Sequence, residues 1–385
     1  MKKLNAEQVI GLVPDELLDN LSSETGVDYC VKKLKGKIIF KLFLYAILNS
    51  KSISLRMLQA IYNSDKFKNL FDLGKQKIKH SGIADRLTNI NYQYFEKIFR
   101  YLIDSHQVDE IIFANKKVNV RKIDSTIVTL SSKLLKIGMD NNPGKKNLKY
   151  TVEINQGIPV NLIFFKDQKY LSEENALPEL IKQKSAKTGL NITLFDRGVQ
   201  SKQTFVELDK EKINFVSRLT KHKYIVVKDL PLDKKTTPTL KIISDQMVKF
   251  SNVEEKIDHE FRLVTGVSKE TKEKLFFITN VSFLSAAEIT DLYSSRWEIE
   301  IFFRFIKQEL NFSHLLNRSE NGIKVLMYLT MLAAILLTIY KKVNKIVGFA
   351  VAKFMFLDEL ESNLMNSWRS EITPVFHPPN SRFVA

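Results

Sequence analysis

Apolar residues in the first part of the chain recur at helical spacing. The pattern is clearest over residues 38–48, 55–62 and 92–103, where apolar positions repeat every three or four residues. Such spacing places the apolar side chains on one face of a helix, where they can pack against a neighbour. The sequence therefore predicts an all-helical N-terminal domain over residues 1–113.

After residue 113 the pattern changes to short apolar runs rich in β-branched residues. A strand or strand pair is predicted at 118–130, and a hairpin joins strands 150–154 and 158–165 through Asn155-Gln156-Gly157. Helix and strand then alternate twice, at residues 173–184, 191–195, 200–208 and 214–217. A three-strand meander followed by this alternation is the order expected of a ribonuclease-H-like catalytic core, whose first part we assign to residues 114–218.

Residues 219–280 differ from this core because they are lysine-rich and lack helical spacing. They contain three apolar β patches, at 224–227, 261–267 and 274–279. We interpret the region as a β-rich insertion rather than a continuation of the core. Helical spacing then predicts the C-terminal helical part of the catalytic core at 281–365, followed by a tail at 366–385. The predicted fold class is α/β, with a ribonuclease-H-like catalytic core, a β-rich insertion domain and an all-helical N-terminal domain.

One apolar stretch, residues 325–340, raises the question of a membrane span. It holds about 16 mostly apolar residues between Lys324 and Lys341, fewer than the roughly 20 that a spanning helix needs. We therefore predict a buried core helix and no membrane partner. The start of the chain mixes charges with short apolar steps, unlike a signal peptide, so the expected location is cytoplasmic.

The charge balance is strongly basic. The chain has 59 Lys and Arg against 43 Asp and Glu, a net charge of +16. A globular protein this basic attracts polyanions, of which DNA is the commonest, although a lysine-rich proteome explains the excess as well. Cys30 is the only cysteine, which excludes a disulfide within the chain and a cysteine-based zinc site.

Five lysines gather near the first of the strongly amphipathic stretches. They are Lys32, Lys33, Lys35, Lys37 and Lys41. A run of this kind is usually a solvated face, but beside helices in a basic protein it is equally compatible with DNA contact.

Two aspartates lie where predicted strands end. Asp124 follows the run 118–123, and Asp196 follows the apolar strand 191–195. Their simpler explanations are a strand-end turn for Asp124 and a turn or helix cap for Asp196. However, active sites collect at the carboxyl ends of strands in open α/β sheets. Converging carboxylates can hold the paired metal ions, about 4 Å apart, that serve phosphodiester chemistry.

Residues 293–307 predict one amphipathic helix with an unusual polar stripe. At about 100° per residue, its polar members fall within roughly 60° of one another, beside an apolar face. The stripe consists of Tyr293, Arg296, Glu300 and Lys307, and the apolar face of Ile299, Phe302, Phe303, Ile306 and Leu310. The simpler reading is an ordinary helix with i,i+4 pairs, such as Glu300 with Arg304. Glu298 lies about 160° from Glu300 and is a poor candidate for the same site.

The polar stripe is similar to a known signature. Tyr293-x2-Arg296-x3-Glu300-x6-Lys307 matches the YREK signature of bacterial DDE transposases of the insertion-sequence-four family. Asp196-Arg197-Gly198 resembles that family's second motif, and Ile123-Asp124-Ser125-Thr126 resembles its first. The order and spacing fit too, since Asp196 lies 72 positions after Asp124 and Glu300 lies 104 positions after Asp196. The chain departs from the family pattern at Val199, where Tyr is frequent, and at Lys149-Tyr150-Thr151, where Lys-x-His is common.

The resemblance implies a DNA transposase that cleaves transposon ends and joins the 3′-hydroxyl to target DNA. Asp124, Asp196 and Glu300 would be the catalytic residues and would bind two Mg²⁺ ions, for which Mn²⁺ can substitute. The implied DNA contacts are Tyr293, Arg296, Lys307 and Arg197. Double-stranded DNA would be the partner, with the helical domain 1–113 recognising transposon ends, a homodimer in the assembled complex and a nucleoid-associated location in a bacterial cell.

Two other functions remain open from the sequence. One is a catalytically silent DNA-binding protein descended from a transposase, and the presence of all three acids argues against it. The other is a ribonuclease-H-like nuclease without strand transfer, and the helical N-terminal region and the long insertion argue against that.

Overall fold

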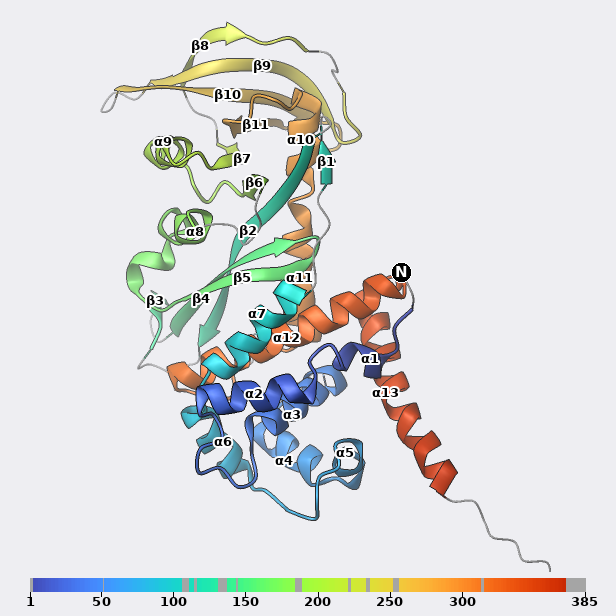
Figure 1. Ribbon diagram of the computed structural model, residues 1–385. Helices are drawn as coiled ribbons and strands as arrows, with labels where there is room; N and C mark the ends of the chain where they lie inside the picture. The colour runs from blue at the N-terminus through green and yellow to red at the C-terminus, as the bar shows by residue number, and fades with distance from the viewer. Residues whose placement is uncertain are drawn as a thin grey trace, which may run out of the picture.

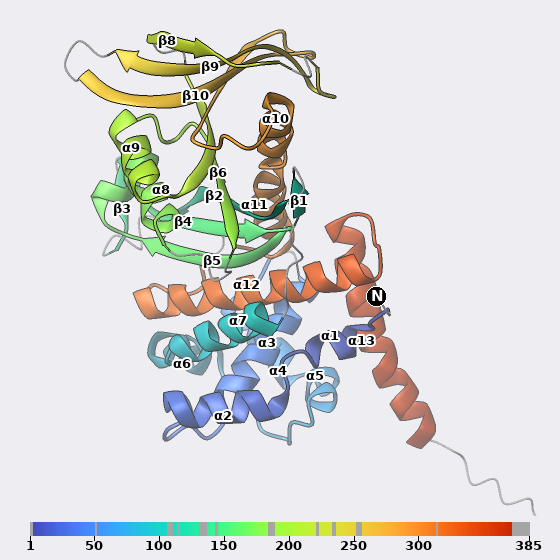
Figure 2. The same cartoon turned by 45° about the horizontal axis from the view of Figure 1, so that its top comes forward.

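The computed structural model describes residues 3–50, 52–105, 111–113, 116–130, 137–142, 145–183, 189–220, 223–232, 236–251, 256–312 and 315–371. A helical half and a half built on one large mixed sheet lie end to end, with α12 (Glu320–Val343) between them (Figures 1 and 2). The functional residues proposed from the sequence belong to the sheet half.

The N-terminal residues form seven helices. These are α1 (Ala6–Ile10), α2 (Asp15–Thr25), α3 (Gly36–Asn49), α4 (Leu55–Asn63), α5 (Asp65–Leu70), α6 (His80–Asn89) and α7 (Gln93–Ser105). Together with α13 (Phe349–Glu371), several of them pack around α12, which is apolar on all sides. By length and composition α12 could cross a membrane, but 94% of its most apolar window is buried within the protein. The expected core helix is confirmed.

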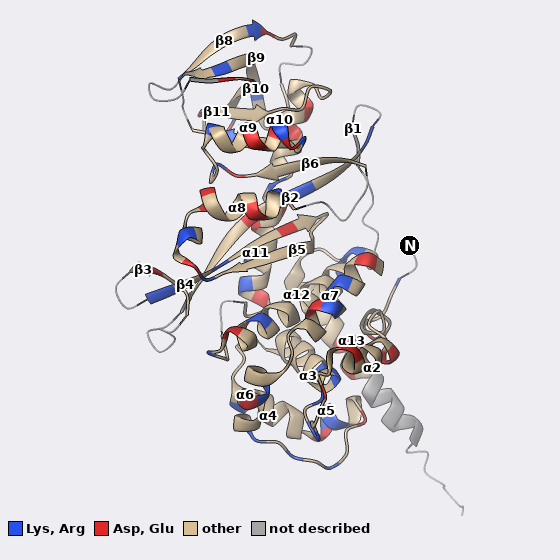
Figure 3. Ribbon diagram, turned by 60° about the vertical axis from the view of Figure 1, so that its left-hand side comes forward, with Lys and Arg blue, Asp and Glu red and all other residues tan. Residues whose placement is uncertain are grey.

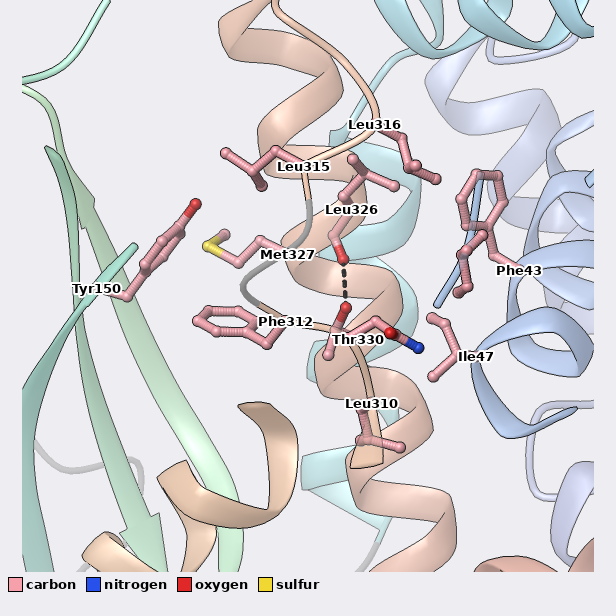
Figure 4. Close-up of a pocket in the computed structure, with 12 residues that line it drawn as sticks. Phe43, Ile47, Tyr150, Leu310, Phe312, Leu315, Leu316, Leu326, Met327 and Thr330 are labelled. Atoms are coloured by element: carbon pink, nitrogen blue, oxygen red, sulfur yellow. Dashed lines mark hydrogen bonds between the residues drawn. The ribbon is translucent and has the colours of Figure 1, made fainter. Parts of the chain in front are cut away.

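The helical half and the sheet share one hydrophobic core. Figure 4 shows α12 between Tyr150 of the sheet on one side and Phe43 of α3 on the other. Tyr150 meets Phe312 edge to face, with 4.9 Å between ring centroids. The small cavity among these side chains has a volume of about 20 Å³, room for no more than about one water molecule. Removing the N-terminal helices would therefore expose α12.

The sheet has eleven strands. They are β1 (Ile111–Phe113), β2 (Lys116–Leu130), β3 (Met139–Asn142), β4 (Lys145–Asn155), β5 (Ile158–Phe165), β6 (Leu190–Phe195), β7 (Asn214–Leu219), β8 (Tyr224–Asp229), β9 (Leu240–Ser251), β10 (Lys256–Ser268) and β11 (Lys274–Thr279). Their order is β3-β4-β2-β6-β7-β11-β10-β9-β8, with β1 paired to β2 and β5 paired to β4. The β4–β5 hairpin turns at Gln156 and Gly157, both with positive φ, as a tight hairpin turn requires.

The two faces of the sheet carry different helices. Neighbouring residues of β2 point to opposite faces. Arg121 contacts the end of α8 (Glu173–Ile181), whereas Lys122 contacts α11 (Trp297–Glu309). A 3-10 turn, η2 (Gln168–Leu171), precedes α8, while α9 (Lys202–Lys210) covers β7 and β10, and α10 (Ala286–Ser294) packs on β7, β9 and β10. The core strands β2, β4 and β5 are antiparallel, and β6 and β7 run parallel to β2, which is the order predicted from the sequence.

The strands of the region 219–280 continue the core sheet, and the assignment of this region as a β-rich insertion domain stays a prediction. Strand β11 pairs antiparallel with the core strand β7, from Phe276 opposite Leu219 to Thr279 opposite Val216. Strands β10, β9 and β8 then extend the sheet outward from β11. The physical reason is that β7 would otherwise present an open edge of unpaired backbone groups, and β11 returns beside it to pair them.

Candidate active site

The sheet register places the two aspartates side by side. Strands β2 and β6 are parallel neighbours, with Lys122 opposite Leu194. Two residues further along each strand lie Asp124 and Asp196, so both point to the face that carries α10 and α11. Strand β6 ends at Phe195, and Asp196 therefore stands at its carboxyl end, as expected from the sequence.

The predicted helix over residues 293–307 is two helices, so the expectation of one continuous helix was wrong. Helix α10 ends at Ser294 and α11 begins at Trp297. The hydroxyls of Ser294 and Ser295 donate back to the carbonyl oxygens of Thr290 (2.8 Å) and Leu292 (2.7 Å). The Arg296 amide donates to the carbonyl oxygen three residues back, at 2.9 Å, and the helix tightens here. Consecutive serines that bond the backbone are a known cause of such breaks.

Three residues of the predicted stripe still converge on the aspartates. The Tyr293 hydroxyl donates to Asp196 Oδ1 at 3.0 Å. The Arg296 guanidinium lies between two acids, with Nη1 at 3.4 Å from Asp124 Oδ2 and Nη2 at 2.5 Å from Glu300 Oε1. Glu300 thus forms an i,i+4 pair with Arg296, so a pair of the ordinary helical kind is present, with Arg296 in place of Arg304 as the partner.

Glu298 is directed away from this group. Its carboxylate forms an ion pair with Lys122 at 2.9 Å, and Lys122 is 2% exposed. A buried ammonium needs such a counter-charge, because an unpaired charge is expensive to bury. The structure thus supports the expectation that Glu298 does not share the site of Glu300.

Lys307 and Arg197, the other two residues expected to contact DNA, are more exposed than the three acids. Both side chains are exposed, Lys307 on α11 and Arg197 in the turn after Asp196. Partial burial lowers the pKa of the Lys307 ammonium, and the charge of Asp124 acts in the opposite direction. Lys307 is therefore on the same side of α11 as the acids, whereas Arg197 stands at the rim of the site.

The environment of Asp124 favours its protonated form. Burial raises the pKa of Asp124 from 3.8 to about 7, and the charges of Glu173 and Asp196 add to the rise. The Ser125 amide, which donates to Asp124 Oδ1 at 2.7 Å, and the Arg296 guanidinium act in the opposite direction. Burial also raises the pKa of the Tyr293 phenol, with Asp196 adding to it. A group of acids in this state gains from an added cation.

Arg218 belongs to this site and was not singled out from the sequence. The register of β6 with β7 places Ser217 opposite Phe195, so Arg218 lies beside Asp196. On the neighbouring strand β11, the residue paired with Arg218 is Phe277. The Phe277 ring packs edge to face on Tyr293, with 5.2 Å between ring centroids. The Arg218 Nε atom is buried and has no hydrogen-bond partner within the part of the chain that the structure describes. A signal was present, because Arg218 follows the predicted strand 214–217 just as Asp196 follows the predicted strand 191–195.

The donor groups fit a hydrated divalent cation by chemistry, because carboxylate oxygens are the ligands that Mg²⁺ prefers. Asp124 and Asp196 are in register on one face. Glu300, however, is held by Arg296, and within the described ranges no three Asp, Glu, His or Cys side chains are already close enough to share an ion. The fit is therefore complete only when Arg296 releases Asp124 and Glu300.

Several known proteins are similar to this chain. A transposase for insertion sequence element IS4SA of Synechocystis is 25% identical over 247 residues, which are 59% of this chain and 65% of that protein. The transposase y4zB of Sinorhizobium fredii is 27% identical over 40% of this chain and 43% of its own length. A transposase for IS5377 of Geobacillus stearothermophilus is 32% identical over 24% of this chain and 25% of its own. The matches thus span less than two thirds of each relative.

The fold has a solved counterpart. A piggyBac transposase, solved by cryo-EM as a synaptic complex with hairpin DNA, matches 99% of this chain and 87% of its own, with a TM-score of 0.51 and 10% identity. The sequence also matches the family described as "Transposase DDE domain" over residues 115–336, which include Asp124, Asp196 and Glu300. Since that match covers more than half of the chain, the protein belongs to the transposase DDE domain family.

Proposed function

We propose that the protein is an insertion-sequence transposase that cleaves the ends of its element and joins the freed 3′-hydroxyl to target DNA. Asp124, Asp196 and Glu300 are the catalytic carboxylates of this proposal. The observation that carries it is their convergence from two strands and a helix, with Tyr293 and Arg296 bonded to them. The YREK pattern over Tyr293–Lys307 and the membership of the insertion-sequence-four family are part of the same proposal.

Two divalent cations, Mg²⁺ or Mn²⁺, supply the chemistry when bound, since such a pair activates the attacking oxygen and stabilises the leaving one. The carboxylates of Asp124, Asp196 and Glu300 hold them. Tyr293 fixes the orientation of Asp196 through its hydroxyl. Arg296 neutralises Asp124 and Glu300 in the metal-free protein and transfers its hydrogen bonds to a DNA phosphate when the site is loaded.

Two further arginines and a lysine extend the proposed DNA contacts. Arg218 offers a buried Nε–H with no partner beside Asp196. Lys307 and Arg197 are exposed, the first on α11 and the second in the turn after Asp196. Cationic side chains around the reacting strand position the phosphate backbone and carry no sequence preference. The partner in this proposal is double-stranded DNA, and a homodimer brings two ends together.

Cleavage of DNA that carries the element's own ends tests the proposal. Asp124→Ala, Asp196→Ala and Glu300→Ala are each expected to slow Mg²⁺-dependent cleavage by at least about 1,000-fold, or about 4 kcal/mol in the barrier. Binding of the end DNA should stay close to wild type. Asp140→Asn is the control, because Asp140 is an acid of the sheet half whose side chain is 74% exposed, and it should cleave normally.

The same assay separates the alternative functions. Cleavage without joining to a second DNA molecule identifies a nuclease that lacks strand transfer. Binding of end DNA with no cleavage by the wild type, in Mg²⁺ or Mn²⁺, identifies a catalytically silent descendant. Near-normal cleavage by any of the three alanine variants removes that residue from the proposed catalytic set.

A further inference from the structure

Helix α8 presents a fourth carboxylate to the site. Figure 3 shows acidic residues on α8, and two of them, Glu173 and Glu174, form its first turn. Both lie near the turn that follows Asp196, but their surroundings differ. Glu174 is fully engaged in hydrogen bonds, whereas no donor bonds the Glu173 carboxylate among the residues that the structure describes.

The glycine after Asp196 makes room for Glu173. A Cβ atom at Gly198 would lie 2.0 Å from Glu173 Oε2 and 2.8 Å from Glu173 Cβ, closer than any such contact in proteins. The Glu173 carboxylate therefore lies directly against Gly198, two residues after Asp196. At this position any residue larger than glycine has to push Glu173 away.

The position of Glu173 is fixed from both ends of α8. At the start, the Glu174 carboxylate accepts from the Gln200 amide at 2.8 Å and from the Thr204 hydroxyl at 3.2 Å, which ties α8 to the start of α9. At the end, Arg121 donates to the carbonyl oxygens of Leu180 (3.2 Å) and Ile181 (3.1 Å). A half-buried carboxylate held this firmly and left without a donor has room for an additional partner.

The charges nearby show which side Glu173 faces. Its negative charge acts on Asp124, and it also acts on the ammonium of Lys149, which is 1% exposed and donates to the Leu171 carbonyl. Lys149 is thus influenced by Glu173 and Asp124 together. Glu173 therefore lies close enough to Asp124 to act on its charge, on the side of the sheet that carries α8.

From this placement we infer that Glu173 is a positioning residue of the metal site, which adds negative charge and an acceptor oxygen for the hydration shell of a divalent cation held by Asp124 and Asp196. The inference rests on the proposed function. Mg²⁺ keeps several of its waters when it binds to proteins, so an acceptor one water layer away stabilises it. Outer groups of this kind typically contribute about 10–100-fold in metal affinity.

Binding of Mn²⁺ alone, measured by calorimetry without DNA, tests the inference apart from catalysis. We expect Glu173→Gln to weaken Mn²⁺ binding by about tenfold or more, with little change in the melting temperature. Glu179→Gln is the matched control, since Glu179 is an exposed acid of the same helix that accepts from the Tyr170 hydroxyl. It should bind Mn²⁺ like the wild type.

Gly198→Ala supplies a second, independent variant. Its methyl group displaces Glu173, so it should weaken Mn²⁺ binding by a similar factor in the wild type and by less than about twofold in the Glu173→Gln background. An equal loss in both backgrounds would mean that the alanine acts by shifting Asp196, and it overturns the inference.

The outcomes also separate this inference from the proposed function. Loss of binding in Asp124→Asn together with unchanged binding in Glu173→Gln keeps the metal site and rejects the role of Glu173. A lower melting temperature with unchanged affinity in Glu173→Gln identifies a structural counter-charge for Lys149 and rejects it as well. Absent binding in the wild type, or unchanged binding in Asp124→Asn, rejects the metal site itself.

Discussion

The buried arginines of the sheet differ from those of the candidate site in how completely they are hydrogen-bonded. Arg121 and Arg262 each form a two-pronged ion pair, with Glu153 and Asp245, and each also donates to two backbone carbonyls. Among the residues that the structure describes, Arg296 and Arg218 each leave a buried Nε without a partner. Native proteins satisfy nearly all buried donors. In the proposed function, these two Nε–H groups are available to a DNA phosphate at the candidate site.

The largest expected effect is on the free energy of unfolding, at one of the two fully paired arginines. Arg262→Ala should lower the free energy of unfolding by about 3–5 kcal/mol, because it leaves the Asp245 carboxylate, whose side chain is 0% exposed, without its counter-charge. Urea denaturation measures the change. Arg304→Ala, at an exposed position of α11, is the control and should change it by less than about 0.5 kcal/mol. A loss of less than about 1 kcal/mol in the free energy of unfolding of Arg262→Ala would remove the distinction between the arginines of the sheet and those of the candidate site.

The next effect depends on pH. Since the pKa of Asp124 is raised from 3.8 to about 7, its carboxyl destabilises the metal-free protein increasingly as the pH rises through this interval. Asp124→Asn removes that cost and should raise the free energy of unfolding by about 2–4 kcal/mol at pH 8 and by little at pH 4. Asp140→Asn, where the side chain is 74% exposed, should show no such trend. A gain for Asp124→Asn that is equal at pH 4 and pH 8 contradicts the raised pKa.

A smaller effect is expected on DNA binding. Arg296→Ala should reduce the slope of log affinity against log salt by about one, since one phosphate contact is lost. Cleavage should fall only partly, unlike the loss expected for Glu300→Ala. Arg304→Ala, at an exposed position eight residues later on α11, provides the comparison. An altered melting temperature with an unaltered salt slope would show that Arg296 only neutralises Asp124 and Glu300.

The smallest effects concern the N-terminal lysines. Lys37 and Lys41 pair with Asp19 and Asp15 of α2, both at 2.9 Å, so Lys37→Ala should cost less than about 1 kcal/mol and leave the salt slope unchanged. Lys32 is exposed, and Lys32→Ala should reduce the slope by about one if this region binds transposon ends. Unchanged slopes in both variants would place end recognition elsewhere in the protein.

Much of the sheet half could be predicted from local pattern. The strand 158–165 is observed as β5 with the same bounds, and 191–195 is observed as β6 with one more residue. Asp196 could be assigned to a strand end because apolar runs and their polar ends are visible in the sequence. Tyr293, Arg296 and Glu300 could be grouped because their identities and spacing are distinctive, even though the helix between them is broken.

Other features depend on contacts that spacing does not reveal. The break at Ser295 comes from serine hydroxyls that donate to backbone carbonyl oxygens. The helical spacing of apolar residues in the sequence continues across the break. The pairing of β11 with β7 joins residues about sixty positions apart, so no local signal distinguishes it from a separate domain. Glu173 and Gly198 each look ordinary alone, and only their contact in space makes either informative.

The central place of α12 has a consequence for the order in which the chain folds during synthesis. Helices α1 to α7 leave the ribosome before α12, and the faces of α1, α3, α6 and α7 that pack on α12 lack this partner until residues 320–343 follow. At about 5–20 residues per second, the interval between them lasts more than ten seconds. During that time the apolar faces that later cover α12 are exposed to solvent. The helical half is then open to aggregation and to binding by chaperones. Amounts of folded protein in the cell should therefore depend on how the part of the chain that holds α12 is translated.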